Sequence, residues 1–134
     1  MSSNSSSLTI SSDLSNVSLV FDWLEKKLYK LIENKSKIDT LSVIIQEAVV
    51  NAIIHGNKED KSKNVTLSYT LSKNLHLEIQ DEGEGISFKN KEKSSDLIKP
   101  EDLLKESGRG IILMKHFCKE VIFKKRSVEL IVEL

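Results

Sequence analysis

The chain has 134 residues, a length that suits one compact domain with a single hydrophobic core. Lysine plus arginine equals aspartate plus glutamate, at 20 each, so the sequence has no basic footprint for a nucleic-acid partner. The one cysteine, Cys118, excludes an internal disulfide and a cysteine-based zinc site. Because no signal peptide and no window of about 20 apolar residues is evident, we expect a cytoplasmic location and no membrane partner.

The N-terminal part of the chain predicts a tail, a strand and a helix. Residues 1–7 are mostly serine, and we expect them to be a disordered tail in front of a single domain over residues 8–134. Residues 8–11 are expected to form a short strand. Helix-capping residues follow, and apolar residues then recur at helical spacing, which predicts one amphipathic helix over residues 14–33.

A second helix is predicted to begin near Lys37, after a turn, and to end at Gly56. Within it Glu47, Asn51 and His55 are four residues apart, so in a regular helix their side chains lie nearly above one another. Taken singly, each has an ordinary explanation as a solvated residue, a local hydrogen-bonder or a histidine favoured by the helix dipole. Because this polar stripe borders a buried face, we interpret it as the floor of a cleft.

The rest of the chain predicts four strands, one long loop and a third helix. Alternating apolar residues predict an antiparallel hairpin of strands at 65–71 and 75–79. Residues 86–107 form a long, lysine-rich loop, a kind of segment that commonly acts as a lid. A helix at 111–119 and two last strands, 121–124 and 128–134, follow. This order predicts an α+β, two-layer sandwich of a mixed, mainly antiparallel sheet with helices on one face.

Two glycine segments flank the long loop. The first, DEGEG at residues 81–85, ends a strand, and the carboxylate of Asp81 can accept a hydrogen bond from an exocyclic amine such as that of adenine. Gly83 and Gly85 permit a ligand to approach the backbone closely. On its own the segment could equally be a simple turn.

The second segment, Gly108-Arg109-Gly110, is expected to open the third helix. Free backbone N–H groups at a helix N-terminus can face an anion, and Arg109 can add a charged contact to a phosphate or to a protein carboxylate. Neither segment matches the phosphate-binding P-loop or a dinucleotide fingerprint. A nucleotide bound here would therefore be held in another way.

Taken together, E-x-x-x-N-A-x-x-H-G, D-x-G-x-G and G-x-G at the start of a helix resemble the three nucleotide boxes of the GHKL ATPase superfamily, which includes gyrase and histidine kinases. Within it the chain most resembles the bacterial anti-sigma-factor serine/threonine kinases. The likeness rests on EAVVNAIIHGN (47–57), DEGEGI (81–86) and GRGIILMKHFCKEV (108–121). It covers essentially the whole chain from about Leu8 and implies the Bergerat-type ATP-binding fold.

The resemblance implies a role for each motif residue in a site for ATP and Mg²⁺. Asn51 would supply the amide oxygen that holds Mg²⁺, and Asp81 would fix adenine. Glu47 would be the general base that accepts the proton of an attacking hydroxyl. The remaining ATP-binding residues would shape the nucleotide wall and the hinge of the lid: Gly83, Gly85, Gly108, Arg109 and Gly110.

The resemblance also implies a protein serine kinase that is an anti-sigma factor in a partner-switching pathway. It would sequester a sigma factor in one state and phosphorylate a serine of a STAS-type antagonist in the other. A homodimer is implied, with residues 8–10 as a candidate edge. One departure is that Lys125-Arg126-Ser127 replaces a glycine–threonine pair common in the last hairpin, which we interpret as a tighter turn.

Two other functions fit the same motifs. One is an ATP-binding module that sequesters partners without transferring phosphate, and Glu47 argues against it because a pure binder needs no base. The other is the excised ATPase domain of a sensor histidine kinase. The N-terminal strand and helix of this chain argue against that second alternative.

Overall fold

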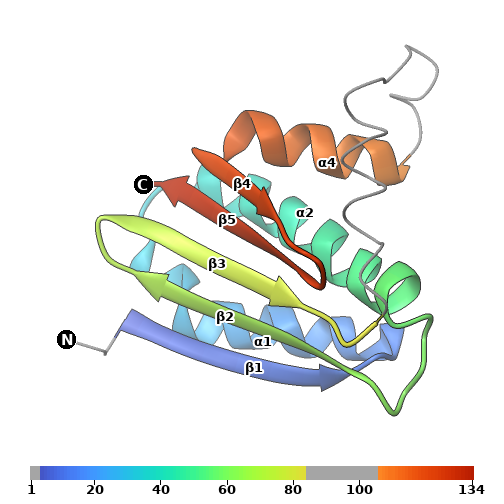
Figure 1. Ribbon diagram of the computed structural model, residues 1–134. Coiled ribbons are helices and arrows are strands. Elements are labelled where there is room, and N and C mark those ends of the chain that lie inside the picture. The colour runs from blue at the N-terminus through green and yellow to red at the C-terminus, as the bar shows by residue number, and fades with distance from the viewer. Residues whose placement is uncertain (1–3, 84–105) are drawn as a thin grey trace.

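The computed structural model describes residues 4–83 and 106–134, so the predicted lid lies almost wholly outside the described residues. Figure 1 shows two layers, a sheet in front and helices covering its other face. The sheet has five strands in the order β1-β2-β3-β5-β4. Its strands are β1 (Ser5–Ser11), β2 (Asn64–Leu71), β3 (Asn74–Gln80), β4 (Glu120–Phe123) and β5 (Ser127–Glu133). The predicted α+β sandwich with helices on one face is confirmed.

The sheet is antiparallel at every pairing of the described strands, so the predicted mixed sheet is wrong in that respect. Two helices lie between β1 and β2, and the chain reverses direction three times along this path, an odd number that makes these neighbours antiparallel. One helix connects β3 to β4, and a single crossover makes those two strands parallel. They are not neighbours, however, because β5 lies between them and runs against both.

Strand β1 begins at Ser5, which pairs with Thr70 of β2. The sequence pattern had indicated a tail through residue 7 and a strand from residue 8. The serines at 5–7 instead continue the antiparallel ladder, because backbone hydrogen bonding to a neighbouring strand does not require apolar side chains. The strand is therefore three residues longer than expected.

The predicted helix over residues 14–33 is divided into three pieces. A 3₁₀ turn, Leu14–Asn16, precedes α1 (Val17–Lys27), and a second 3₁₀ turn, Tyr29–Leu31, follows it. The Asp13 carboxylate accepts a hydrogen bond from the Ser15 N–H and so fixes the tight first turn. Over three residues, the 3₁₀ and α periods place apolar side chains on nearly the same face, so the pattern alone did not separate them.

Helix α2 (Lys35–Asn51) begins directly after Asn34, whose side chain accepts a hydrogen bond from the Lys37 N–H at 3.2 Å. The predicted turn at this point is therefore the helix cap. The helix then widens into a π-turn, Ala52–Gly56, and the Asn57 N–H donates to the Ala52 carbonyl at 2.8 Å. In such turns the donor lies five positions after the acceptor, and they occur frequently at functional sites.

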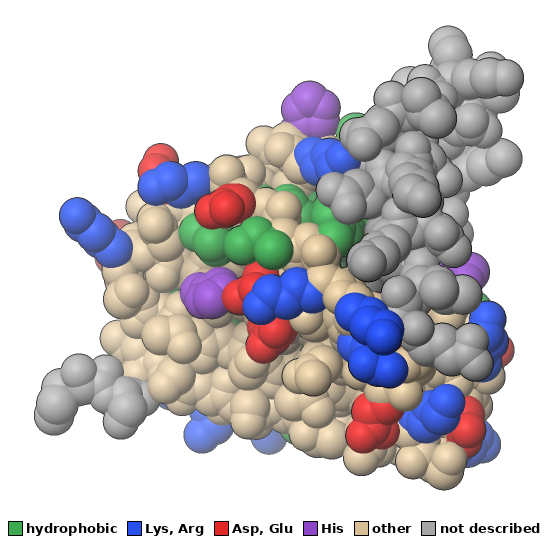
Figure 2. Space-filling view, viewed as in Figure 1, with side chains coloured by type: hydrophobic (Ala, Val, Ile, Leu, Met, Phe, Trp, Pro, Cys, Tyr) green, Lys and Arg blue, Asp and Glu red, His purple; other side chains and the backbone are tan. Residues whose placement is uncertain are grey.

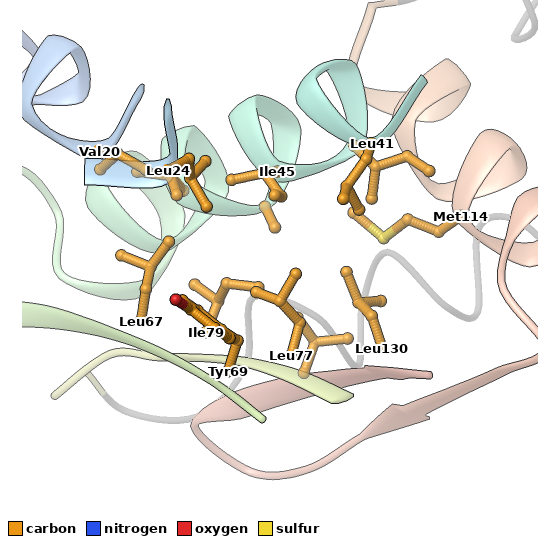
Figure 3. Packing of buried hydrophobic residues seen from close by; sticks show 14 of the residues in the cluster. Val20, Leu24, Leu41, Ile45, Leu67, Tyr69, Leu77, Ile79, Met114 and Leu130 are labelled. Atoms are coloured by element: carbon orange, nitrogen blue, oxygen red, sulfur yellow. The ribbon is translucent and has the colours of Figure 1, made fainter. Parts of the chain in front are cut away.

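The hydrophobic core lies between the helices and the inner face of the sheet (Figure 3). Alternate residues of each central strand point inward, as their spacing predicted. Figure 3 shows side chains of α1, α2 and α4 (Glu106–Phe117) above those of β2, β3 and β5. Buried residues that it labels include Leu24, Ile45 and Met114 from the helices and Leu67, Leu77 and Leu130 from the strands.

The segment Lys35–Gly56 is long and apolar enough to cross a membrane by length and composition, with a mean hydropathy of 1.3 over its best window. We had expected no such window. In the structure this segment is the central helix of the domain, and its buried apolar residues face α1, α4 and the sheet. Its composition is thus that of a core helix.

The outer face of the sheet carries charged side chains beside an apolar patch (Figure 2). On it Glu129 accepts hydrogen bonds or ion pairs from Lys124 and from His76, the latter at 2.8 Å. The hydrogen bond from Lys124 is the main cause that lowers the pKa of the Glu129 carboxyl. This pairing offsets the repulsion from Glu78, the cross-strand neighbour of Glu129, and it fixes the end of the β4–β5 hairpin.

Leu77→Ala is expected to lower the free energy of unfolding by about 2–5 kcal/mol, because Leu77 is completely buried at the centre of β3. Urea denaturation followed by circular dichroism measures this change. Leu19→Ala on α1 is the control, since Leu19 is 49% exposed and its loss should cost about 0.5 kcal/mol or less. Equal effects of the two substitutions would contradict the core described here.

Candidate functional site

Several segments that are distant in sequence meet at one end of the sheet. In Figure 1 the end of α2, the end of β3 and the β4–β5 turn all lie on the right, and α4 also begins there. Helices α2 and α4 pack side by side and run in opposite directions, so the start of α4 lies near the end of α2. The motif residues found in the sequence belong to these segments.

Of the three residues in the predicted polar stripe of α2, two lie on the same face of the helix. Glu47 and Asn51 lie one turn apart within the regular helix, Glu47 half-buried and Asn51 only 1% exposed. His55 lies in the π-turn and is exposed. The wider turn rotates His55 away from the line of the first two residues, so the four-residue spacing ceases to mark one face after Asn51.

The Asn51 side chain is an unusual group for the interior of a helix layer. Its amide nitrogen is buried and has no hydrogen-bond partner among the described residues. Leaving a buried polar group unpaired costs about 1–3 kcal/mol. An amide carries both an oxygen acceptor and a nitrogen donor, so it can turn its oxygen toward a cation. The unpaired Asn51 amide is therefore suited to a ligand that the polypeptide itself does not provide.

Asp81, directly after β3, is also buried, at 1% exposure, and it lies against the end of α2. A Cβ atom on Gly56 would lie 2.3 Å from Oδ2 of Asp81. A Cβ atom on Gly83 would lie 1.7 Å from the carbonyl oxygen of Gly56. Only glycine at these two positions permits the π-turn and the Asp81–Gly83 loop to approach so closely.

Each backbone N–H of the Asp81–Gly83 loop has an acceptor. The Asp81 N–H donates to the carbonyl of Arg126, and the Gly83 N–H donates to Oδ1 of Asp81, both at 2.8 Å. The Glu82 N–H donates to Oδ1 of Asn57 at 2.8 Å. The side chain of Arg126 completes the set, because its Nε donates to the Gly83 carbonyl at 2.7 Å.

Asn57 is a buried junction that the sequence analysis did not identify. Its Nδ2 donates to Oγ of Ser12 at 2.7 Å and to the carbonyl of Asn64 at 3.0 Å, while its Oδ1 accepts from Glu82. It thereby joins the ends of β1, α2 and β3 to the start of β2. Sequence offered one signal, an asparagine directly after a helix-ending glycine, but its partners are remote in the chain.

The second glycine segment lies differently from the prediction. Helix α4 begins at Glu106, so Gly108 and Gly110 lie inside its first turns and do not precede it. Glutamate is favoured in the first turn of a helix, which explains the earlier start. Gly108 is the third helical residue, so its N–H is among the four without an intrahelical acceptor, whereas that of Gly110 is not. The Arg109 side chain and Gly85 lie outside what the structure describes.

In residues 4–83 and 106–134, no three His, Cys, Asp or Glu side chains lie close enough to hold a metal ion together. A site with one amide oxygen suits Mg²⁺, which commonly takes most of its ligands from phosphates and water. The Asn51 amide oxygen thus fits an Mg²⁺ ion that takes its other ligands from a nucleotide and water.

Comparison with known proteins decides the family. The family described as the histidine kinase-like ATPase domain matches residues 10–134, which include every described segment of the candidate site. The chain belongs to this family. The resemblance to the GHKL superfamily is thereby confirmed, and membership of this ATPase family implies ATP binding by the domain.

Relatives of this histidine kinase-like ATPase domain are named anti-sigma F factors. That of Shouchella clausii (strain KSM-K16) is 37% identical over 86 residues, covering 63% of this chain and 58% of the relative. That of Geobacillus stearothermophilus is 35% identical over 88 residues, covering 64% and 59%. That of Anoxybacillus flavithermus (strain DSM 21510 / WK1) is 37% identical over 103 residues, covering 73% and 68%. The chain spans less than two thirds of the first two relatives.

Gly83→Ala is expected to lower the free energy of unfolding by about 1–3 kcal/mol, because the added methyl group meets the backbone of Gly56 and forces it to move. Chemical denaturation measures the change. Gln80→Ala is the matched control, since Gln80 is exposed at the end of the same strand and should change stability by about 0.5 kcal/mol or less. A Gly83→Ala protein as stable as the parent would contradict the close approach.

Proposed function

We propose that the chain is an ATP-dependent protein serine kinase and anti-sigma factor. It phosphorylates a serine of a STAS-type antagonist and sequesters a sigma factor, in the cytoplasm and as a homodimer. The observation that carries this proposal is the buried Asp81 carboxylate held against Gly56, at the same end of the domain as Glu47 and the unpaired amide of Asn51. The family of the chain and the names of its relatives support it.

In this proposal Asp81 recognises adenine. A carboxylate offers about four acceptor positions, so Asp81 can accept from the Gly83 N–H and also from the exocyclic amine of a base. Because the carboxylate is buried, its bond with that amine is shielded from water and strengthened. The remaining residues of the proposed ATP site form the wall around the nucleotide and the hinge of the lid. They are Gly83, Gly85, Gly108, Arg109 and Gly110.

Asn51 would hold Mg²⁺ through its amide oxygen. When bound, the ion neutralises negative charge on the phosphates of ATP. Asn51 is rigidly placed for this task, because its helix packs against the sheet and lies beside α4. Burial of the amide also excludes water that would otherwise compete for it.

Glu47 acts as the general base. Its carboxylate accepts the proton of the serine hydroxyl while the hydroxyl oxygen forms a bond to the γ-phosphorus of ATP. The bond between that phosphorus and the bridging oxygen breaks, and ADP leaves. Because Glu47 lies one helical turn before Asn51, the base and the metal ligand are held on one rigid element.

The partners follow from the relatives and from the edge of the sheet. Relatives named anti-sigma F factors favour a sigma factor and its antagonist as partners. In the described chain β1 pairs only with β2, so its outer edge is available for a second copy of the chain. We place the homodimer contact there, at residues 8–10.

Glu47→Gln is expected to abolish phosphate transfer to a STAS-type partner while leaving ATP affinity within about threefold, because a base acts in the transition state and not in ground-state binding. Transfer is measured with γ-labelled ATP, and affinity by calorimetry. Gln46→Ala, an exposed neighbour on α2, is the control and should retain transfer. Transfer by Glu47→Gln at the parent rate would refute the base, and tight ATP binding without transfer by the parent would favour the sequestering module.

Asn51→Ala is expected to weaken ATP binding about tenfold or more in millimolar magnesium and much less in excess chelator, because the amide holds the metal. The same substitution removes an unpaired buried amide, so the apo protein should be as stable as the parent or more stable. Calorimetry and urea denaturation measure the two effects. Parent affinity that is equal with and without magnesium would contradict this role.

A further inference from the structure

One contact of the site comes from a segment that the family motifs do not explain. The β4–β5 turn carries Arg126, whose carbonyl accepts from the Asp81 N–H and whose Nε donates to the Gly83 carbonyl. A single residue thus binds both ends of the three-residue loop that contains the base-recognising carboxylate. Figure 2 shows Lys and Arg side chains gathered at this end of the sheet, where the turn lies.

The turn is well placed to act as a fixed support. The Lys124 N–H donates to the Ser127 carbonyl at 2.8 Å and closes the turn. The Lys124 side chain pairs with Glu129 on the adjoining strand. The backbone that presents Arg126 is therefore held on two sides, and the guanidinium of arginine is itself planar and rigid.

The opposite side of the loop is supported by the end of α2. Gly56 lies against the Asp81 carboxylate, and the Asn57 side chain accepts from the Glu82 N–H. Without Arg126 the loop would keep this support and lose its only described side-chain contact with the β4–β5 turn.

We propose that Arg126 is a positioning residue for purine recognition: by holding the Gly83 carbonyl it keeps the Asp81 carboxylate oriented toward the 6-amino group of the base. This inference rests on the proposed function, because it assumes that Asp81 receives adenine. A bond from a charged donor to a carbonyl is among the stronger hydrogen bonds. Loss of this bond should therefore lower affinity most for a ligand whose binding depends on the orientation of Asp81.

A comparison of ATP with inosine triphosphate tests this inference, because inosine carries an oxygen in place of the 6-amino group. The parent should bind ATP more tightly than inosine triphosphate. Arg126→Ala should weaken ATP binding about tenfold and inosine triphosphate binding much less, so that the preference for ATP largely disappears. Arg126→Lys retains a charged donor and should recover part of the preference. Calorimetry at fixed millimolar magnesium measures all affinities.

Lys125→Ala is the matched control, since Lys125 is exposed in the same turn and should change neither affinity. Thermal unfolding of each variant shows whether it remains folded. A purely structural role for Arg126 predicts that Arg126→Ala weakens binding of both nucleotides by the same factor. That result leaves the preference for ATP unchanged and would overturn this inference alone. A parent protein that binds neither nucleotide would overturn the proposed function together with the inference.

Discussion

The close approach of Gly56 to Asp81 is the constraint on which the rest of the site depends. It brings the end of α2 against the end of β3, so the helix that carries Glu47 and Asn51 has a fixed relation to the Asp81–Gly83 loop. The π-turn produces this approach, because it ends the helix with a wider turn and places Gly56 and Asn57 against the sheet. The proposed roles of the side chains thus depend on this backbone geometry, which sets their relative positions.

Much of the fold could be predicted from the sequence, because buried apolar residues recur at the period of the strand or helix that contains them. Leu75, Leu77 and Ile79 alternate with polar residues and all three are buried, and the apolar residues of α2 follow the helical repeat. The sequence could not show that the sheet is wholly antiparallel. That property depends on which strands become neighbours, and the period of two is the same for either direction.

Candidate site residues could be named from the sequence where glycines and polar residues interrupt the apolar pattern, as at Asn51, Asp81 and Gly83. The site was not predictable where it depends on contacts between remote segments. Asn57 hydrogen-bonds to Ser12 and Asn64, and Arg126 to Gly83 at the adjoining ends of β5 and β3. No local sequence pattern indicates such pairs. The four-residue spacing predicted that Glu47, Asn51 and His55 lie on one face, but His55 does not. The π-turn that moves it is not marked by any pattern in the sequence.

The measurement that tests the central claim most directly is calorimetric titration of the folded chain with ATP and ADP in millimolar magnesium. The account predicts saturable binding of both nucleotides at one site per chain, with weaker ATP binding when magnesium is chelated. Absence of binding heat for either nucleotide at several temperatures, from a protein whose circular dichroism shows it to be folded, would contradict the account.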